Sequence, residues 1–198
     1  MRFIDISTDT KNLYILTENE QVVFFMWNRA GEITFELKGA GARAHIFAFF
    51  VGKDNDQKIL TINQKHIAPS TSSHVLVKSI LDDRASFAYR GTIHIAPEAL
   101  LSDASQENRN LLLSEEARAS SEPTLEILNN DVRCHHAATT SPLNKEQLFF
   151  ARTRGLSDTQ AEKLLIQGFL RSSIEKLGTL VSSQDQEKVL ALIGKSSA

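Results

Sequence analysis

The alternation of apolar and polar residues over most of the chain is the feature that most constrains its fold. From residue 3 to about 128, short segments rich in β-branched and aromatic residues repeat a period-two pattern, which is typical of strands with one buried face. No convincing helical pattern occurs in this stretch. The sequence therefore predicts strands at 22–27, 32–37, 44–50, 58–63, 73–80, 86–89, 92–95 and 124–128, and it leaves 109–118 open between a buried strand and a turn or short helix.

Turn-forming residues separate these segments, at 28–31, 39–41, 52–56, 69–72, 82–83 and 129–131. Many short strands in one chain indicate a sandwich, a barrel or a β-solenoid. The Asn-Gly and Asp-Gly turns that are typical of hairpins do not occur in the sequence. Several strands also recur at loosely regular intervals of about one solenoid turn. Both observations favour a solenoid.

The pattern changes after Pro142, where three helices are expected. The first begins at a capping sequence at 144–147 and stops at Gly155, and the second begins at 157–160 and ends near Gly178. A third begins near Ser183 and stops before Gly194. The predicted organisation is a β domain over 1–142 and a helical domain over 143–198, which forms a small cap at the end of the strands.

Composition excludes several classes of function. The 198 residues are 41% hydrophobic and 23% charged, which is typical of a soluble domain with one core. A formal net charge of −2 offers no basic surface for nucleic acid, and no apolar run approaches the roughly 18 residues of a membrane span. The N-terminus lacks the layout of a signal peptide, and a single cysteine forms no internal disulfide. We expect a cytoplasmic protein without a nucleic-acid or membrane partner.

The only cysteine lies beside two histidines in NNDVRCHHAATTSP, residues 129–142. In an extended strand, Cys134 and His136 project from one face and His135 from the other. Thiolate and neutral imidazole are donors that suit zinc and iron–sulfur chemistry. A closed zinc site needs about four ligands, however, and no second pair with metal-binding spacing exists. A small buried cysteine beside a hydrogen-bonded histidine is the alternative.

Other constellations are weaker. His66, His74 and His94 lie on three strand candidates, and they either line one face of a solenoid or are separate surface groups. The sequence contains no phosphate-binding Gly-rich loop with a following Lys-Ser/Thr, and no Gly-x-Ser-x-Gly motif. We therefore expect a non-catalytic protein that hydrolyses no nucleotide itself.

Residues 117–169 resemble the C-terminal signature of the SufB/SufD family of iron–sulfur cluster assembly scaffolds. The resemblance rests on PTLEI, NDV, CHH, AAT and FFARTRG in this order. Upstream, HIAPSTSSHVLVKSILDDRASFAYRGTIHIAPEA resembles β-helix rungs of the family, and SQENRNLLLSEEARA resembles the stretch that joins them to the signature. The similarity covers roughly residues 60–172. It implies a right-handed parallel β-helix with a small C-terminal α-helical cap.

The resemblance also implies partners and site residues. Members of the family pair through their β-helices, and each binds a SufC-type ATPase through its C-terminal helices. The implied partners are thus that ATPase, a SufB-like subunit or a second copy of the chain, and indirectly a sulfur-donating desulfurase. His136 is implied as a ligand of iron or of a transient iron–sulfur cluster, with Cys134 as a nearby thiol. The implied ATPase-binding residues are Phe149, Phe150, Arg152, Arg154, Leu164 and Phe169.

Departures from the family pattern indicate a SufD-like subunit. Only Asn108 and Asn110 lie where SufB has an upstream scaffold cysteine, and Ala137 replaces the glutamate that follows the histidine. The sequence also begins almost inside the β-helix, as in an N-terminally shortened member. We expect Cys134 and His136 to point together out of the coil, at the seam between two subunits.

Two further hypotheses stay open at this point. The first is an adaptor β-helix that binds the ATPase but carries no cluster chemistry. The second is a small metal-dependent enzyme that uses His66, His94 and His136.

Overall fold

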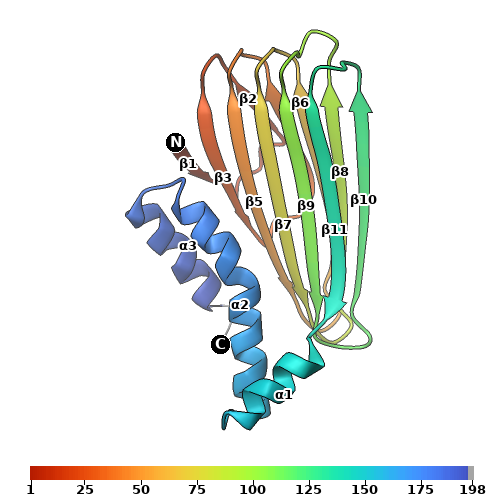
Figure 1. Ribbon diagram of the computed structural model, residues 1–198, viewed down its shortest axis with the longest axis vertical. Coiled ribbons are helices and arrows are strands. Elements are labelled where there is room, and N and C mark those ends of the chain that lie inside the picture. Colours follow the sequence, from red (N-terminus) through yellow and green to blue (C-terminus); the bar gives the residue numbers. More distant parts are fainter. Residues whose placement is uncertain (196–198) are drawn as a thin grey trace.

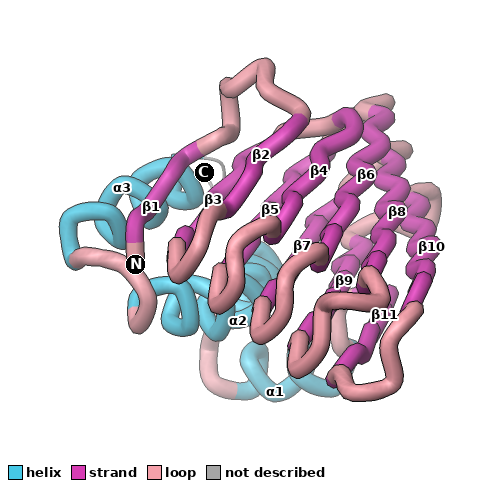
Figure 2. Tube along the Cα trace, turned by 90° about the horizontal axis from the view of Figure 1, so that it is seen from above, coloured by secondary structure: helices cyan, strands magenta, loops and turns pink. Residues whose placement is uncertain are grey.

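The computed structural model of the protein, which describes residues 1–195, is a parallel β-helix with helices against one face (Figure 1). Successive strands alternate between two sheets, so each coil adds one strand to each sheet (Figure 2). The six-stranded sheet has the order β1-β3-β5-β7-β9-β11 and the five-stranded sheet the order β10-β8-β6-β4-β2, with parallel neighbours throughout. The strands are β1 (Arg2–Asp5), β2 (Leu13–Leu16), β3 (Gln21–Trp27), β4 (Gly31–Leu37), β5 (Arg43–Gly52), β6 (Gln57–His66), β7 (Ser72–Leu81), β8 (Ser86–Ile95), β9 (Asp103–Leu112), β10 (Arg118–Ile127) and β11 (Arg133–Pro142).

The predicted parallel β-helix is confirmed, and most predicted strands lie inside observed ones. The set of predicted strands missed β1, β2, β11 and the first half of β9, contained only the end of β10, and divided β8 into two strands at Gly91. Gly91 does not end the strand: a Cβ at this position would lie 1.8 Å from Oε1 of Gln106, so the glycine makes room for a side chain from the opposite sheet. The ambiguous stretch 109–118 contains the end of β9, a turn and the start of β10.

Asparagine and aspartate turn the chain at several corners of the coil. Asn19, Asn28, Asp54 and Asp83 have φ values of 57°, 51°, 55° and 49°. This left-handed region is one that Asn and Asp adopt more readily than other side chains. The turns predicted at 28–31, 52–56 and 82–83 are therefore corners between the two sheets.

The interior of the coil changes from apolar to polar along its length. In the N-terminal half, aromatic rings from the two sheets meet, with the ring centroids of Phe24 and Phe35 4.8 Å apart. In the C-terminal half, amides on β9 replace these rings: Asn110 Nδ2 donates to Asn108 Oδ1 at 2.9 Å, and Ser79 donates to Asn110 Oδ1 at 2.7 Å. Buried amides of this kind need partners, and here they supply them to one another.

The C-terminal segment forms α1 (Lys145–Thr153), α2 (Asp158–Gly178) and α3 (Ser183–Lys195). The predicted caps are confirmed, since the side chain of Asn144 accepts from Gln147 N, and Ser157 and Gln160 form a capping box. The predicted stop before Gly194 is wrong, because a glycine lowers helix propensity by about 1 kcal/mol without necessarily ending a helix. None of the helices within residues 1–195 is both long and apolar enough to span a bilayer.

Helices α2 and α3 lie against the outer face of the six-stranded sheet (Figure 1). The expectation that they pack on the end of the coil is wrong, because strands β3 and β5 are apolar on both faces and their outer face needs a cover. This second core joins the sheet residues Val23, Phe25, Phe47, Phe49, Leu76, Ile80 and Leu111 to the helix residues Leu170, Ile174, Leu177, Val189 and Ile193.

One buried lysine ties α2 to the sheet. Lys78 on β7 is 2% exposed, and its Nζ donates to the carbonyl oxygen of Phe169 and, at 3.3 Å, to Ser172 Oγ. The same ammonium lies 4.5 Å from the centroid of the Phe169 ring.

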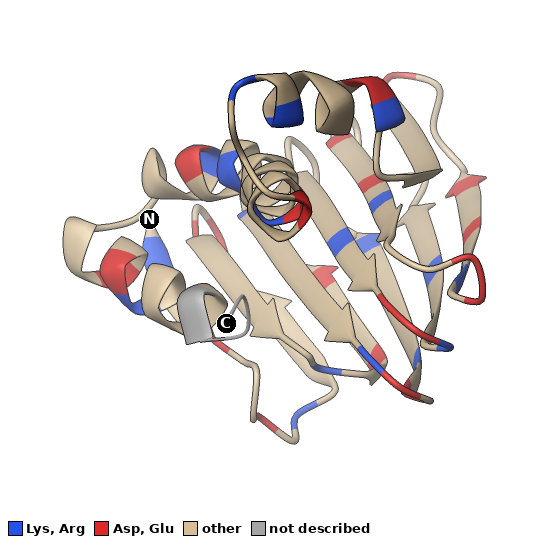
Figure 3. Ribbon diagram, turned by 90° about the horizontal axis from the view of Figure 1, so that it is seen from below, with Lys and Arg blue, Asp and Glu red and all other residues tan. Residues whose placement is uncertain are grey.

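Elsewhere, lysine and arginine are interspersed with aspartate and glutamate on the helices and loops seen from below (Figure 3). The division of the chain into domains at residue 143 stays a prediction.

Candidate functional site

Cys134 and His136 lie on β11, the last strand of the six-stranded sheet, opposite Ala104 and Gln106 of β9. Gln106 points into the coil, where its Nε2 donates to the Gly91 carbonyl of the other sheet at 3.2 Å. Side chains at paired positions share a face, so Cys134 and His136 share one face, as predicted. That face is the inner one, and the expectation that the two side chains point out of the coil is wrong.

The coil is open at this end, because no strand in the described part of the chain follows β10 and β11 in the sheets. Leu125 and Ile127 on β10 pair with Ile93 and Ile95, which are 0% exposed. Yet Leu125 and Ile127 are 36% and 40% exposed. The inward-facing residues Leu125, Ile127, Cys134 and His136 are called the open end below. They form an unfinished layer of core with a thiol and an imidazole at its edge.

The two donors at the open end differ in their surroundings. Cys134 is partly buried against the small cluster of Ile93, Ile95, Ala99 and Ala104. Burial raises the pKa of its thiol, and the nearby Asp103 carboxylate raises it further. His136 is exposed. The imidazole is therefore the more accessible of the two donors.

These donors do not form a complete metal site. Among the described residues, no group of three or more His, Cys, Asp and Glu side chains is placed to hold a metal ion. The open end therefore offers at most part of a coordination sphere. The missing ligands would have to come from a second molecule that covers this end.

The other histidines considered from the sequence lie apart from this end. His66 is buried inside the coil, 2.7 Å from Thr71 Oγ1 and 2.6 Å from Ser73 Oγ, so the interpretation of it as a surface group is wrong. His94 lies on the outer face of the five-stranded sheet, with Nδ1 3.2 Å from Glu126 Oε2. Because His66, His94 and His136 occupy separate places, an enzyme that uses all three has no common site.

Most of the predicted ATPase-binding residues gather on α1 and the start of α2. Phe149, Phe150 and Leu164 are 64%, 60% and 51% exposed. They line a shallow, almost wholly apolar groove of about 600 Å³. Arg154 lies 5.1 Å from the centroid of the Phe150 ring, and Arg152 pairs with Asp158 at 3.0 Å. Phe169 does not belong to this groove, because it packs towards the sheet beside Lys78.

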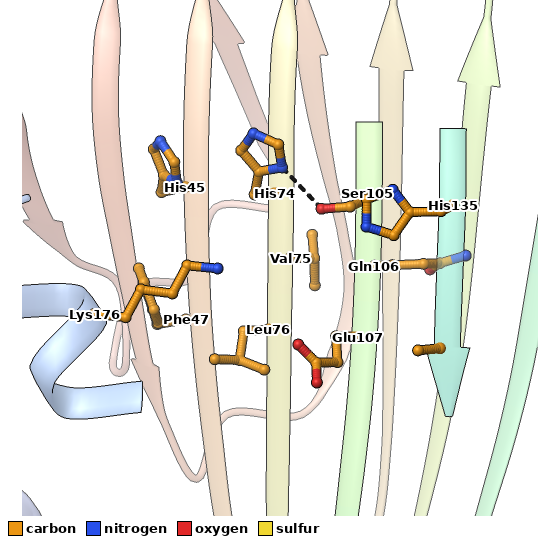
Figure 4. A pocket seen from close by; sticks show the side chains of 11 residues that line it. His45, Phe47, His74, Val75, Leu76, Ser105, Gln106, Glu107, His135 and Lys176 are labelled. Carbon is orange, nitrogen blue, oxygen red and sulfur yellow. Dashed lines mark hydrogen bonds between the residues drawn. The ribbon is translucent and has the colours of Figure 1, made fainter. Parts of the chain in front are cut away.

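The sequence interpretation missed a second group of polar residues, on the outer face of the six-stranded sheet. His45 pairs with His74, His74 with Ser105, and Ser105 with His135. Their recurrence once per coil was the available signal, but it requires knowledge of the coil length. These residues line a cavity with Lys176 of α2 (Figure 4).

Comparison with known proteins identifies the family. The family model described as "SUF system FeS cluster assembly, SufBD core domain" matches residues 22–169. SufB of Bacillus subtilis is 27% identical over 188 residues, which cover 89% of this chain and 40% of that protein. SufD of Escherichia coli is 33% identical over 124 residues, 63% of this chain and 29% of that protein.

A third relative is the SufBD family protein slr0076 of Synechocystis, which is 37% identical over 109 residues, 55% of this chain and 24% of that protein. The chain thus spans less than half the length of the relatives that it matches. The coil, the order of the sequence motifs and these matches agree, and the chain belongs to the SufB/SufD family of iron–sulfur cluster assembly proteins.

Proposed function

We propose that the chain is a SufD-like scaffold subunit, which pairs through the open end of its β-helix and binds a SufC-type ATPase through its helices. Membership of the SufB/SufD family supports a role in iron–sulfur cluster assembly. The observation that carries the pairing is the exposure of Leu125 and Ile127, which face inward and are covered by no further strand among residues 1–195. A second subunit would complete this layer.

The two ends of the coil differ in a way that supports pairing at one of them. The N-terminal edge strands β1 and β2 have four residues each, whereas β10 and β11 have ten each. Long edge strands with free N–H and C=O groups invite a further strand. Covering the half-exposed Leu125 and Ile127 would add about 1 kcal/mol for each side chain. The partner is a SufB-like subunit or a second copy of the chain.

In this arrangement an iron ion or a nascent cluster is cargo at the subunit seam. His136 supplies an imidazole, Cys134 supplies a thiol close by, and the partner supplies the remaining ligands. Sulfur reaches the seam indirectly from a desulfurase. Asn108 and Asn110 are hydrogen-bonded to each other inside the coil. These amides lie where SufB has a scaffold cysteine, which supports a SufD-like role without an upstream scaffold thiol.

Anaerobic reconstitution tests the role of His136. The chain is co-purified with a SufB-like subunit and SufC, and iron and sulfide are measured in the complex for wild type and His136→Ala. His94→Ala, on the outer face of the other sheet, is the matched control. We expect His136→Ala to lower the cluster yield while His94→Ala leaves it unchanged. Equal yields in all three proteins would refute the assignment.

The exposed groove on α1 and α2 is the proposed site for the ATPase. Burying an aromatic or leucine side chain contributes about 1.5–3 kcal/mol, so Phe149→Ala combined with Leu164→Ala should weaken SufC binding by more than about tenfold. Leu190→Ala on α3 is the control, because Leu190 is 46% exposed but lies outside the groove. Equal affinity of the double variant and the control, measured by calorimetry, would exclude this surface.

Asn108 and Asn110, which lie where SufB has an upstream scaffold cysteine, support a second candidate function, an adaptor that binds the ATPase and carries no cluster chemistry. Iron and sulfide analysis of the anaerobic complex separates the two. The adaptor predicts normal SufC binding and an iron content that is insensitive to both His136→Ala and Cys134→Ala.

A further inference from the structure

A cavity of about 290 Å³ lies on the outer face of the six-stranded sheet, near the C-terminal end of α2 (Figure 4). It is separate from the open end, because His135 lines it while its neighbours Cys134 and His136 point to the inner face of β11. Its polar side chains are those of His45, His74, Ser105, Glu107, His135 and Lys176.

The imidazoles are brought together by the register of the sheet. The ring centroids of His45 and His74, on neighbouring strands, are 5.1 Å apart. His74 Nδ1 lies 2.8 Å from Ser105 Oγ, and Figure 4 shows His135 beyond that serine. Nδ1 of His45 is shielded from solvent and has no hydrogen-bond partner within the described structure. A buried polar atom of this kind is costly unless something pairs with it.

The charges around the cavity leave one cation uncompensated. Figure 4 shows the Lys176 amine directed between His45 and Val75, and Lys176 forms no ion pair with any described residue. The Glu107 carboxylate, in contrast, is already bound by Arg109. An exposed lysine beside imidazole and hydroxyl groups favours an anion.

Protonation of the two partly buried imidazoles is disfavoured by their surroundings. Burial lowers the pKa of His45 to about 4, with further lowering by His74, Lys176 and Arg43. Burial also lowers the pKa of His74, against the raising effect of Asp103. A bound anion would counter both effects, because it replaces lost hydration and offsets the neighbouring positive charge.

A metal ion fits this cavity less well than an anion. No three metal-binding side chains converge here among the described residues, and both ring nitrogens of His74 already face serine hydroxyls. The Lys176 ammonium would also repel a cation.

We propose that this cavity binds a small oxyanion of the sulfate or phosphate type, held by Lys176 Nζ, by the His45 ring and by the Ser105 hydroxyl, which His74 orients through its Nδ1. The site uses the outer face of the sheet, so it is independent of the proposed pairing through the open end. Loss of one would leave the other intact.

Sulfate is the suitable first probe, because its charge is constant between pH 6 and pH 8. We expect sulfate to bind to the full chain in calorimetry at matched ionic strength in chloride, and to bind more tightly at pH 6. The increase is up to about tenfold per pH unit for each proton taken up. Glycerol phosphate, titrated in parallel, distinguishes a free ion from an organic molecule that carries the same group.

Lys176→Gln should weaken sulfate binding by about tenfold or more, whereas Lys58→Gln, an exposed lysine on β6, should leave it unchanged. Nitrogen-15 spectra of the His45 and His74 rings report protonation independently of affinity. Equal sulfate affinity in the two lysine variants, or equal affinity at pH 6 and pH 8, would overturn the proposal. Zinc binding that depends on His45 and His74, without sulfate binding, would also overturn it.

Discussion

His66 should make the stability of the coil depend on pH. Its ring is 0% exposed between the sheets, and its neighbours define its hydrogen bonds. Thr71 Oγ1 donates to the Ala68 carbonyl, so it accepts from His66 Nδ1–H, and Ser73 Oγ accepts from Gln64 while donating to His66 Nε2. The neutral ring satisfies every partner. A proton on Nε2 would disrupt this series of hydrogen bonds, because Ser73 could no longer donate to the ring.

The magnitude follows from the pKa in the folded and unfolded states. Burial lowers the pKa of His66 from 6.5 to about 4 in the folded protein. The unfolded chain therefore binds more protons between pH 6.5 and pH 4, and the free energy of unfolding falls as pH falls through this window. At 1.36 kcal/mol per pKa unit, His66 removes about 2 kcal/mol by pH 5 and about 3 kcal/mol below pH 4, while above pH 6.5 its effect vanishes.

Urea unfolding of wild type and His66→Gln at several pH values between 7.5 and 4.5 measures this contribution. Other titrating groups cancel in the difference between the two proteins, and His94→Gln controls for the loss of a histidine as such. We expect the free energy of unfolding of wild type to fall by about 2 kcal/mol more than that of His66→Gln between pH 7.5 and pH 5. Parallel curves for the two proteins would refute the reasoning.

Three further predictions concern single positions. Gly91→Ala should lower the free energy of unfolding by about 1–3 kcal/mol, because the added Cβ would overlap Gln106. Gly168→Ala should raise it by about 0.5–1 kcal/mol, because Gly168 lies within helix α2 and an added Cβ there meets no other atom. Equal effects of the two substitutions in urea unfolding would contradict this reasoning. Burial lowers the pKa of Lys78 to about 8, so wild type should gain stability relative to Lys78→Met as pH rises from 8 towards 10.5, and a constant difference would contradict the burial argument. Because burial and Asp103 raise the pKa of Cys134, its thiol should react with iodoacetamide at pH 7.5 more slowly than free cysteine, and an equal or faster rate would contradict that shift.

Local patterns of the sequence were sufficient to predict the central strands and two of the helix starts. Alternating apolar residues located the central strands, and the side chains of Asn144 and Ser157 located two helix starts. Gly91 misled the strand prediction, because its reason is a long-range contact with Gln106. The pairing of Asn108 and Asn110 on β9 was not predicted, since a sequence does not show that two amides meet inside the coil.

The candidate site was predictable only in part. Alternation correctly placed Cys134 and His136 on one face, but the inward direction of that face depends on the pairing of β11 with β9. The positions of the helices likewise depend on the apolar outer face of β3 and β5, which a period-two pattern with one buried face does not reveal. His45 was missed, and His74 and His135 were not predicted to share a site, because cross-coil neighbours share no local motif.

Sedimentation velocity on the chain alone and with a SufB-like subunit tests the proposed pairing most directly. The comparison is between wild type and Leu125→Lys combined with Ile127→Lys, two changes that place charges in the uncovered layer. We predict that wild type pairs with itself or with the SufB-like subunit, and that the double variant stays monomeric with the circular dichroism of wild type. A wild-type chain that stays monomeric in both samples, or a double variant that pairs as wild type does, would contradict the account.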